Sequence, residues 1–491
     1  MFKTKSLKKL GITLAITAAS LAISSTANAC TTVLVGKDAS NDGSTMIARN
    51  EDMGTAWAKH FVIRQANTNP TNYVSKGNKF ALTLPSKQLK YSATPEWDTS
   101  EGLYEEAGIN SANVAMSGTE SATTKEKVLK LDPLVENGIA EDSIVTVVLP
   151  YITSPKEGVA RLGKIVEEKG AAEVNGVIFS NKEEIWYMEI VSGHHWVAVR
   201  VPDNQYAVIA NTLTIGDIDT TDQGNVQVST GLKNFVETNK LAKNSEKFSV
   251  RDIFADTKED AQYNLPRMWD GQRMLTPSKK KKITDTDFNL FEKPDEPISF
   301  AKVAYILTLH FNGTKYDTMT GSKADKYRPI SVPNTMESHI LQFRSDVPEE
   351  LSGIHWLALG VTDTSNYVPF YSGITKTPAY YQAGTDLPDG NSAYWTYRVT
   401  NILTKTNYQE FKTKETLPLR QEVRDYLAKQ VAKTDTEAKQ IMKDTPDNLP
   451  TYLNEQTEKF AKYSLEKYKE LNKQLLVKMT ELTPTKHNDN L

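Results

Sequence analysis

The only cysteine of the chain, Cys30, is its most nucleophilic side chain and follows a distinctive tripeptide. Ala27-Asn28-Ala29 has the small-x-small form that a signal peptidase recognises just before the bond it cuts. Cleavage there would make Cys30 the first residue, with a thiol and a free α-amine on the same residue. A free α-amine titrates at about pH 7.7–8.0 and can accept the thiol proton as an internal general base. The pattern therefore predicts nucleophilic attack by Cys30 on a carbonyl carbon.

Residues 1–29 have the three parts of a secretory leader: a basic start, an apolar stretch of 14 residues at 10–23, and a short polar end. The apolar stretch is shorter than the roughly 20 residues that cross a bilayer. We therefore predict that 1–29 is a signal peptide that signal peptidase removes. The rest of the chain is then expected to be secreted or held at the cell surface.

A lipid-modified Cys30 is the alternative use of a cysteine at this position. Lipoprotein leaders usually carry an aliphatic residue three positions before the cysteine, where this chain has Ala27. Acylation of the α-amine would remove the general base, so the two interpretations exclude each other. Under the alternative, the protein would be a non-enzymatic, peptide-binding surface lipoprotein.

The segment after the cysteine predicts two strands joined by a turn. Residues 31–35 are β-branched and apolar, 41–44 have turn composition, and 45–48 form a second apolar run. Such a hairpin would bring Arg49 and Asp52 back beside the cysteine. The arginine would lower the thiol pKa, and the carboxylate would orient the amine. The alternative is an ordinary surface hairpin in which Arg49 and Asp52 pair with each other.

These residues also carry a resemblance to a known family. Cys-Thr-Thr at the predicted mature N-terminus, followed by Ala-Arg-Asn-Glu-Asp at 48–52, closely resembles the dipeptidase A family. Its members are cysteine peptidases of the N-terminal nucleophile hydrolase superfamily, more distantly similar to penicillin V acylases and bile salt hydrolases. Further similar segments follow in the family's order at 105–121, 186–211, 263–277 and 327–344. The resemblance covers residues 30 to about 400.

The resemblance implies roles for the residues of the hairpin and of a later strand. Cys30 is expected as nucleophile and, through its α-amine, as base, with Arg49 and Asp52 beside it. Asn211, which ends the segment YAVIAN, is the expected side-chain donor to the oxyanion.

Three further residues are expected at the site. Arg267 is our first choice for a late arginine of the family and Arg273 the second. In the sequence, Glu120 falls near the position at which the acylases have a second asparagine. Because an ionised carboxylate cannot donate a hydrogen bond, we expect Glu120 to bind a substrate ammonium group instead.

The resemblance implies an α+β fold with four layers, α-β-β-α, and the strand-rich first 200 residues agree with it. Helices are predicted near 133–150, 155–170 and 297–311, and strands within 177–190 and 196–201. After about 410 two long charged helical segments follow, interrupted at DTPDNLP. We predict a catalytic domain at 30–405 and a helical C-terminal extension at 406–491 that packs on it or mediates homo-oligomer contacts.

Composition and motifs argue against several other classes. The net charge of −3 disfavours nucleic acid as a partner, and no second apolar segment predicts an integral membrane span. His194 and His195 are adjacent, so on a strand they point to opposite faces and cannot easily share a metal ion. We therefore predict no metal and no cofactor.

The combined prediction is an exported cysteine dipeptidase that hydrolyses the amide bond of dipeptides through an acyl-enzyme. An amidohydrolase for N-acyl amino acids or bile salts is the enzymatic alternative. A papain-like pair would require folding to bring His310, His339 or His355 to the cysteine.

Overall fold

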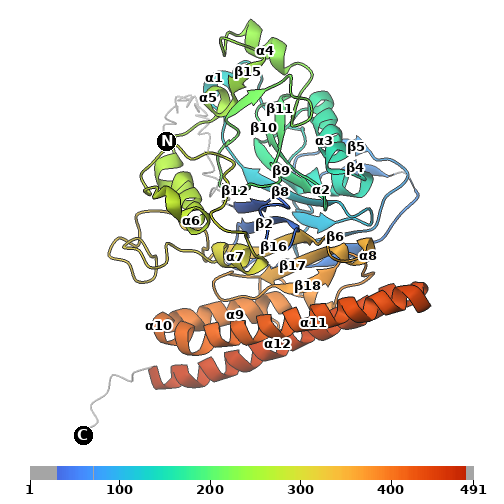
Figure 1. Cartoon of the computed structure of the whole chain (residues 1–491), viewed down its shortest axis with the longest axis vertical. Coiled ribbons are helices and arrows are strands. Elements are labelled where there is room, and N and C mark those ends of the chain that lie inside the picture. Colours follow the sequence, from blue (N-terminus) through green and yellow to red (C-terminus); the bar gives the residue numbers. More distant parts are fainter. Residues whose placement is uncertain (1–29, 70, 483–491) are drawn as a thin grey trace, which may run out of the picture.

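Two six-stranded antiparallel sheets lie face to face at the centre of the protein (Figure 1). The structure is a computed structural model that describes residues 30–69 and 71–482, so the predicted signal peptide at 1–29 lies outside the described residues. Helices cover the outer face of each sheet. This combination of helices and antiparallel sheets confirms the predicted α+β class.

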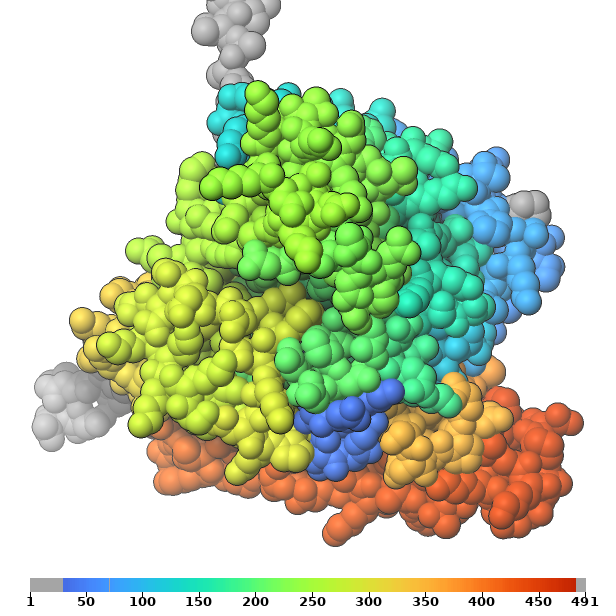
Figure 2. Space-filling view, turned by 45° about the horizontal axis from the view of Figure 1, so that its top comes forward, coloured from blue at the N-terminus to red at the C-terminus, as the bar shows by residue number. Residues whose placement is uncertain are grey.

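The first sheet contains the hairpin that the sequence predicts. Its strands run in the order β12 (Tyr206–Ile209), β1 (Thr31–Val35), β2 (Thr45–Asp52), β16 (Thr335–Phe343), β17 (Gly353–Leu359) and β18 (Val368–Tyr371). The β1–β2 turn reaches the surface as the blue patch of Figure 2. Cys30 lies at the other end of β1, so the cysteine is far along the strand from this exposed turn.

The second sheet supplies the other wall of the interior. Its strands run in the order β14 (Val226–Val228), β11 (Trp196–Arg200), β10 (Ile185–Ile190), β9 (Asn175–Ser180), β8 (Ala115–Ser121) and β7 (Ala107–Ile109). Leu34 and Ile47 of the first sheet belong to one buried cluster with Ile178 and Tyr187 of the second. Alternation along the strands directs these side chains inward.

Helices α2 (Glu141–Val148) and α3 (Pro155–Lys169) pack on the outer face of the second sheet. The α3 helix begins where Ser154 accepts a hydrogen bond from the Glu157 amide, and it ends at Gly170, as predicted. It approaches the sheet closely, because a Cβ added to Gly163 would lie 2.4 Å from the ring of Trp196.

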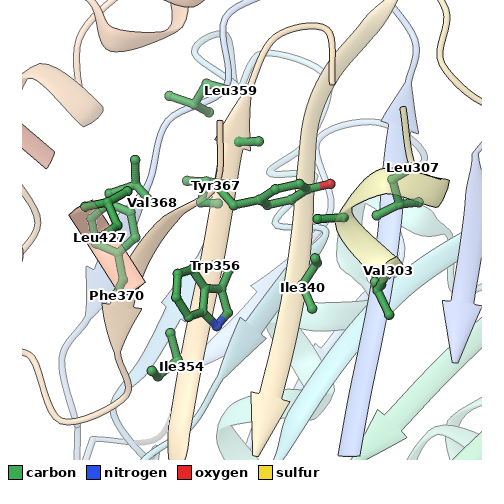
Figure 3. Close-up of a cluster of buried hydrophobic side chains, with 14 of the residues drawn as sticks. Val303, Leu307, Ile340, Ile354, Trp356, Leu359, Tyr367, Val368, Phe370 and Leu427 are labelled. Atoms are coloured by element: carbon green, nitrogen blue, oxygen red, sulfur yellow. The ribbon is translucent and has the colours of Figure 1, made fainter. Parts of the chain in front are cut away.

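A second helical layer covers the outer face of the first sheet. It contains α7 (Phe300–Ile306), α9 (Ala393–Thr406), α11 (Leu417–Asp444) and α12 (Leu449–Leu482), the last three lying together along one side of the molecule (Figure 1). Figure 3 shows Leu427 of α11 beside the side chains of β17 and β18, with Val303 and Leu307 at the other side of the same cluster. The two predicted C-terminal helices are therefore present, separated by a short turn at Pro446–Asn448.

The remaining elements are short. Paired strands are β3 (Val62–Arg64) with β6 (Tyr91–Ala93), β4 (Asn72–Val74) with β5 (Ala81–Thr83), and β13 (Asp217–Asp219) with β15 (Lys247–Ser249). Other helices are α1 (Glu126–Leu129), α4 (Leu232–Thr238), α5 (Val250–Phe254), α6 (Leu265–Leu275), α8 (Glu349–Ser352) and α10 (Tyr408–Phe411). Within residues 30–69 and 71–482, no helix combines the length and the hydropathy of a membrane span.

Two predicted helices are shorter than expected. The segment before α2 is not helical, because the amides of Val135 and Ile139 donate to the carbonyls of Ala171 and Gly170. The helix predicted at 297–311 begins only after Ser299, whose hydroxyl caps it, and is followed within five residues by Phe311 at a φ of +65°. That left-handed backbone cannot continue a helix.

Replacing Leu427 by alanine should show that the C-terminal helices are part of the main core. Leu427 is 1% exposed and packs in the cluster on the first sheet. Loss of its side chain should lower the free energy of unfolding by about 2–5 kcal/mol, measured by urea denaturation. Leu476→Ala, at a position 52% exposed on α12, is the control and should change it by less than about 1 kcal/mol. Equal effects of the two variants would contradict this assignment.

Candidate active site

Cys30 immediately precedes β1 and is 2% exposed. The β1–β2 pairing places Thr32 opposite Arg49 and Thr31 opposite Asn50. The predicted hairpin is therefore present, and its register returns Arg49 to the neighbourhood of the cysteine.

The Arg49 guanidinium contacts the sulfur directly. Its Nη1 donates to Sγ of Cys30 at 3.2 Å and to the carbonyl oxygen of Thr119 at 3.0 Å. Its Nη2 donates to the carbonyl of Gly118 at 2.8 Å and to Glu106 Oε2 at 2.6 Å. The alternative in which Arg49 pairs with Asp52 is wrong, because the acidic partner of Arg49 is Glu106.

Burial raises the pKa of the Cys30 thiol well above its ordinary value. The positive charge of Arg49 lowers that pKa, as the sequence predicts, but burial and the carboxylates of Glu120, Glu141 and Asp52 together outweigh the arginine. The predicted effect of the arginine is therefore present, but the net direction of the thiol pKa is set by burial. A neutral thiol of this kind requires a base before it can attack.

Arg267, on α6, joins the cysteine to the predicted oxyanion donor. Its Nη1 donates to the carbonyl oxygen of Cys30 and, at 3.0 Å, to Oγ1 of Thr31. Its Nη2 donates to Oδ1 of Asn211 at 2.9 Å. Asn211 follows β12, which pairs with β1, so the sheet itself brings the asparagine toward Cys30. The contact also fixes the amide orientation, since Oδ1 accepts and Nδ2 is then the donating end.

The two candidate late arginines lie in different surroundings. Arg267 is fully buried, and burial together with the nearby charge of Arg328 lowers its pKa to about 9. Arg273, six residues further along α6, donates to Asp270 Oδ1 at 2.7 Å and to the carbonyl of Asn312 at 3.2 Å. The structure thus brings Arg267 to the cysteine and directs Arg273 elsewhere.

Asp52 is buried near the cysteine, but its hydrogen bonds go to other residues. Arg328 Nη2 donates to its Oδ2 at 2.7 Å, and the Thr335 hydroxyl donates to its Oδ1. Burial raises the pKa of Asp52, while Arg328 and Thr335 oppose that rise. Its carboxylate acts on the sulfur through its charge, not through a contact in this structure.

Glu120 is buried beneath the cysteine strand. Its Oε1 accepts the Thr32 hydroxyl at 2.5 Å, and among the described residues no donor reaches Oε2. Burial raises the pKa of Glu120 to about 7, although Arg49 and the Thr32 hydrogen bond lower it. This carboxyl group therefore titrates close to neutral pH.

A buried polar chain behind Arg49 was not predicted from the sequence. Arg49 Nε donates to Oγ of Ser117 at 3.0 Å, and Ser117 Oγ lies 2.8 Å from Nε2 of His339. His339 Nδ1 lies 2.8 Å from Oε1 of Glu337. Ser117 therefore links the arginine to the histidine. The available signal was Glu337 and His339 two positions apart, and therefore on one face of the same strand.

Other histidines among the described residues have partners away from the sulfur, and His310 Nδ1 lies 3.1 Å from Asp317 Oδ1. His194 Nδ1 lies 2.8 Å from Asp132, and His195 Nδ1 lies 2.9 Å from Ser229. Ser92 is the hydrogen-bond partner of His355. No group of three or more histidine, cysteine or carboxylate side chains is arranged to hold a metal ion in the described part of the chain.

Asn211 also lines a cavity of about 540 Å³. Its lining includes Ser121 at the end of β8, Glu141 at the start of α2, Asn175 at the start of β9, and Asn264 just before α6. Asn211 and Asn264 are both hydrogen-bonded to Arg267, which contacts Cys30. The cavity therefore borders the cysteine site, and its volume suits a small-molecule substrate.

Comparison with known proteins agrees with this geometry. The family model described as Peptidase family C69 matches residues 29–418. A protein named probable dipeptidase from Latilactobacillus sakei is 39% identical over 462 residues, covering 93% of this chain and 96% of the relative. Probable dipeptidase B from Lactococcus lactis is 41% identical, covering 78% and 82% respectively. A dipeptidase from Bifidobacterium longum is 39% identical, covering 76% and 77%.

Replacing Glu120 by glutamine should change how stability depends on pH. The carboxyl pKa is about 7 in the folded protein and about 4.3 in an unfolded chain. The folded state therefore binds an extra proton between these values, and wild-type stability falls as the pH rises through this window. Glutamine carries no charge to bury, so the fall between pH 5 and 7.5 should be smaller by about 2 kcal/mol.

Urea unfolding of both proteins at the two pH values measures this difference. The same pH dependence in wild type and variant would contradict a raised pKa at Glu120.

Proposed function

The chain belongs to peptidase family C69, and on that basis we propose that it is an exported dipeptidase whose nucleophile is Cys30. The observation that carries the assignment is the 3.2 Å contact between Arg49 Nη1 and the sulfur of the chain's only cysteine. Its relatives with 35–41% identity over most of their length are named dipeptidases.

In the proposed reaction, removal of residues 1–29 frees the α-amine of Cys30. This amine takes the thiol proton while the sulfur attacks the carbonyl carbon of the first amino acid of a dipeptide. A base on the same residue can deprotonate the thiol although the thiol pKa is raised, because no other side chain has to move into place. Arg49 stabilises the thiolate as it forms, since its guanidinium already donates to Sγ.

The tetrahedral intermediate carries a negative charge on the former carbonyl oxygen. Asn211 is the proposed side-chain donor, because Arg267 holds its Oδ1 and leaves Nδ2 as the donating end of the amide. A single well-placed donor of this kind lowers the barrier by about 3–4 kcal/mol. Arg267 itself is a positioning residue that orients Asn211 and holds the Cys30 carbonyl.

Collapse of the intermediate breaks the amide bond. The Cys30 ammonium returns its proton to the leaving amine, which departs as the second amino acid. The first amino acid then remains as a thioester on the sulfur. Water, deprotonated by the same α-amine, attacks this thioester and releases the first amino acid with regeneration of the thiol.

We also assign the fold to the N-terminal nucleophile hydrolase class, with α-β-β-α layering. Two facing antiparallel sheets between helical layers, and a nucleophile at the start of a strand in one of them, support the assignment. Export and removal of the leader are proposed from the leader sequence alone. The catalytic domain at 30–405 and the helical extension at 406–491 remain part of the same proposal.

N-terminal sequencing and intact mass of the protein from its native host test the maturation step. We expect a chain that begins Cys-Thr-Thr and carries no added mass. A lipid on the cysteine, or a start at any other residue, would overturn the α-amine as base and favour a tethered protein.

The Cys30→Ala variant tests the nucleophile. It should be exported and folded like the wild type but lose at least 1,000-fold in dipeptide hydrolysis, because no other described side chain is placed to attack. Circular dichroism and thermal unfolding serve as the folding controls. Turnover within tenfold of wild type would overturn the assignment of Cys30.

A further inference from the structure

The cavity that borders Cys30 has an acidic lining. Among the described lining residues, Glu141, Glu173, Asp256 and Glu259 carry carboxylates and Lys258 carries the opposing amino group. The Lys258 amino group is already 3.0 Å from Oδ2 of Asp256. The cavity therefore attracts cationic groups and disfavours anionic ones.

Glu141 and Glu173 form a carboxylate pair on the inner wall of this cavity. The backbone amide of Glu141 donates to Oε2 of Glu173 at 3.3 Å. Burial raises the pKa of Glu141 well above its ordinary value, and the charges of Glu106 and Glu173 add to that rise. Glu141 lines the same cavity as Asn211, which Arg267 connects to Cys30. An ammonium group bound beside the pair would lower the pKa of Glu141 again and so hold it as a carboxylate.

Asn175 is an independent indication that the cavity is built to bind a ligand. It lines the same cavity and is 1% exposed, and its Nδ2 donates to Glu173 Oε2 at 3.2 Å. Among the described residues, no donor reaches its Oδ1. A buried acceptor without a donor costs about 1–3 kcal/mol unless something binds to it. A ligand group that reaches Oδ1 from the cavity must donate a hydrogen bond to it.

A dipeptide presents such a donor at a fixed place. Its α-ammonium lies two bonds, about 2.5 Å, from the carbonyl carbon that the sulfur attacks. We propose that the cavity binds the free α-ammonium of the substrate, with Glu141 as the counter-ion and Oδ1 of Asn175 as a second acceptor. This inference rests on the proposed function, because it names the substrate group that the same active site recognises.

The subsite differs from the one expected from the sequence. Glu120 was predicted to bind the ammonium group, but its Oε1 is engaged by Thr32 beneath the strand. Glu141 opens instead to the cavity from the first turn of α2. An acidic subsite here also selects against substrates that place a neutral acyl group at this position, since the carboxylate pair would then stay uncompensated.

Steady-state kinetics with L-alanyl-L-alanine and its N-acetylated form test the proposal. The wild type should prefer the free dipeptide by at least 100-fold in kcat/KM. Glu141→Gln should raise KM for the free dipeptide at least tenfold and change hydrolysis of the acetylated form by less than threefold. Glu136→Gln is the matched control, an exposed carboxylate in the loop before α2, and should behave as wild type.

Equal losses on both substrates, or no loss on the free dipeptide, would overturn Glu141 as the counter-ion. Glu173→Gln supplies a second variant if Glu141→Gln fails to fold, and it should weaken the same preference. Asn175→Ala should also raise KM for the free dipeptide without changing the acetylated form.

Binding measurements separate this proposal from the proposed catalytic function. Calorimetry should show L-alanyl-L-alanine binding to Cys30→Ala, and binding at least tenfold weaker to Cys30→Ala/Glu141→Gln. Hydrolysis that survives in Cys30→Ala would overturn the nucleophile while leaving this comparison intact. Equal affinity of the two binding variants would overturn the ammonium subsite even if Cys30 proves essential.

Discussion

The buried guanidinium of Arg49 is the interaction on which the rest of the structure depends. It comes from β2 of the first sheet, and each of its three nitrogens donates to the segment that forms β7 and β8 of the second. A buried charge is costly unless its hydrogen bonds are complete, so the two sheets must keep the register that completes them. The same group holds the sulfur of Cys30, which ties the position of the nucleophile to the packing of the sheets.

The space between the sheets is divided into an apolar part and a polar part. Leu34, Ile47 and their neighbours form the apolar part, whereas Arg49, Glu120 and His339 lie in the polar part on the same strands or beside them. Burial of this many ionisable groups opposes stability, as the raised pKa of Glu120 indicates. The helical layers on the outer faces supply large apolar clusters that offset this cost.

The chemistry follows from the same low-polarity surroundings. Burial keeps the thiol neutral, and an adjacent carboxylate strengthens that effect, so attack requires a base close to the sulfur. An α-amine on Cys30 would meet that requirement without a catalytic histidine. In the proposed mechanism, the acidic cavity beside it has a separate task, the recognition of a positive charge.

The sequence by itself determined the local features of this protein. Turn composition and β-branched residues were sufficient to predict the β1–β2 hairpin, and a proline start with a glycine end was sufficient for α3, since both signals act over a few residues. The resemblance placed Arg267 ahead of Arg273 as the late arginine and indicated Asn211 as the donor to the oxyanion. The predicted helix lengths were wrong where backbone amides donate to distant carbonyls, as the amide of Val135 does.

Only the tertiary structure determined which charged groups lie close together. Glu106, Glu141 and Asn175 come from segments up to 145 residues from Cys30 in the chain, and no periodicity relates them. The partner of Arg49, the partners of Asp52 and the net direction of the thiol pKa depend on which groups are buried together. Burial and long-range pairing are properties of the packed sheets, and a local pattern cannot specify them.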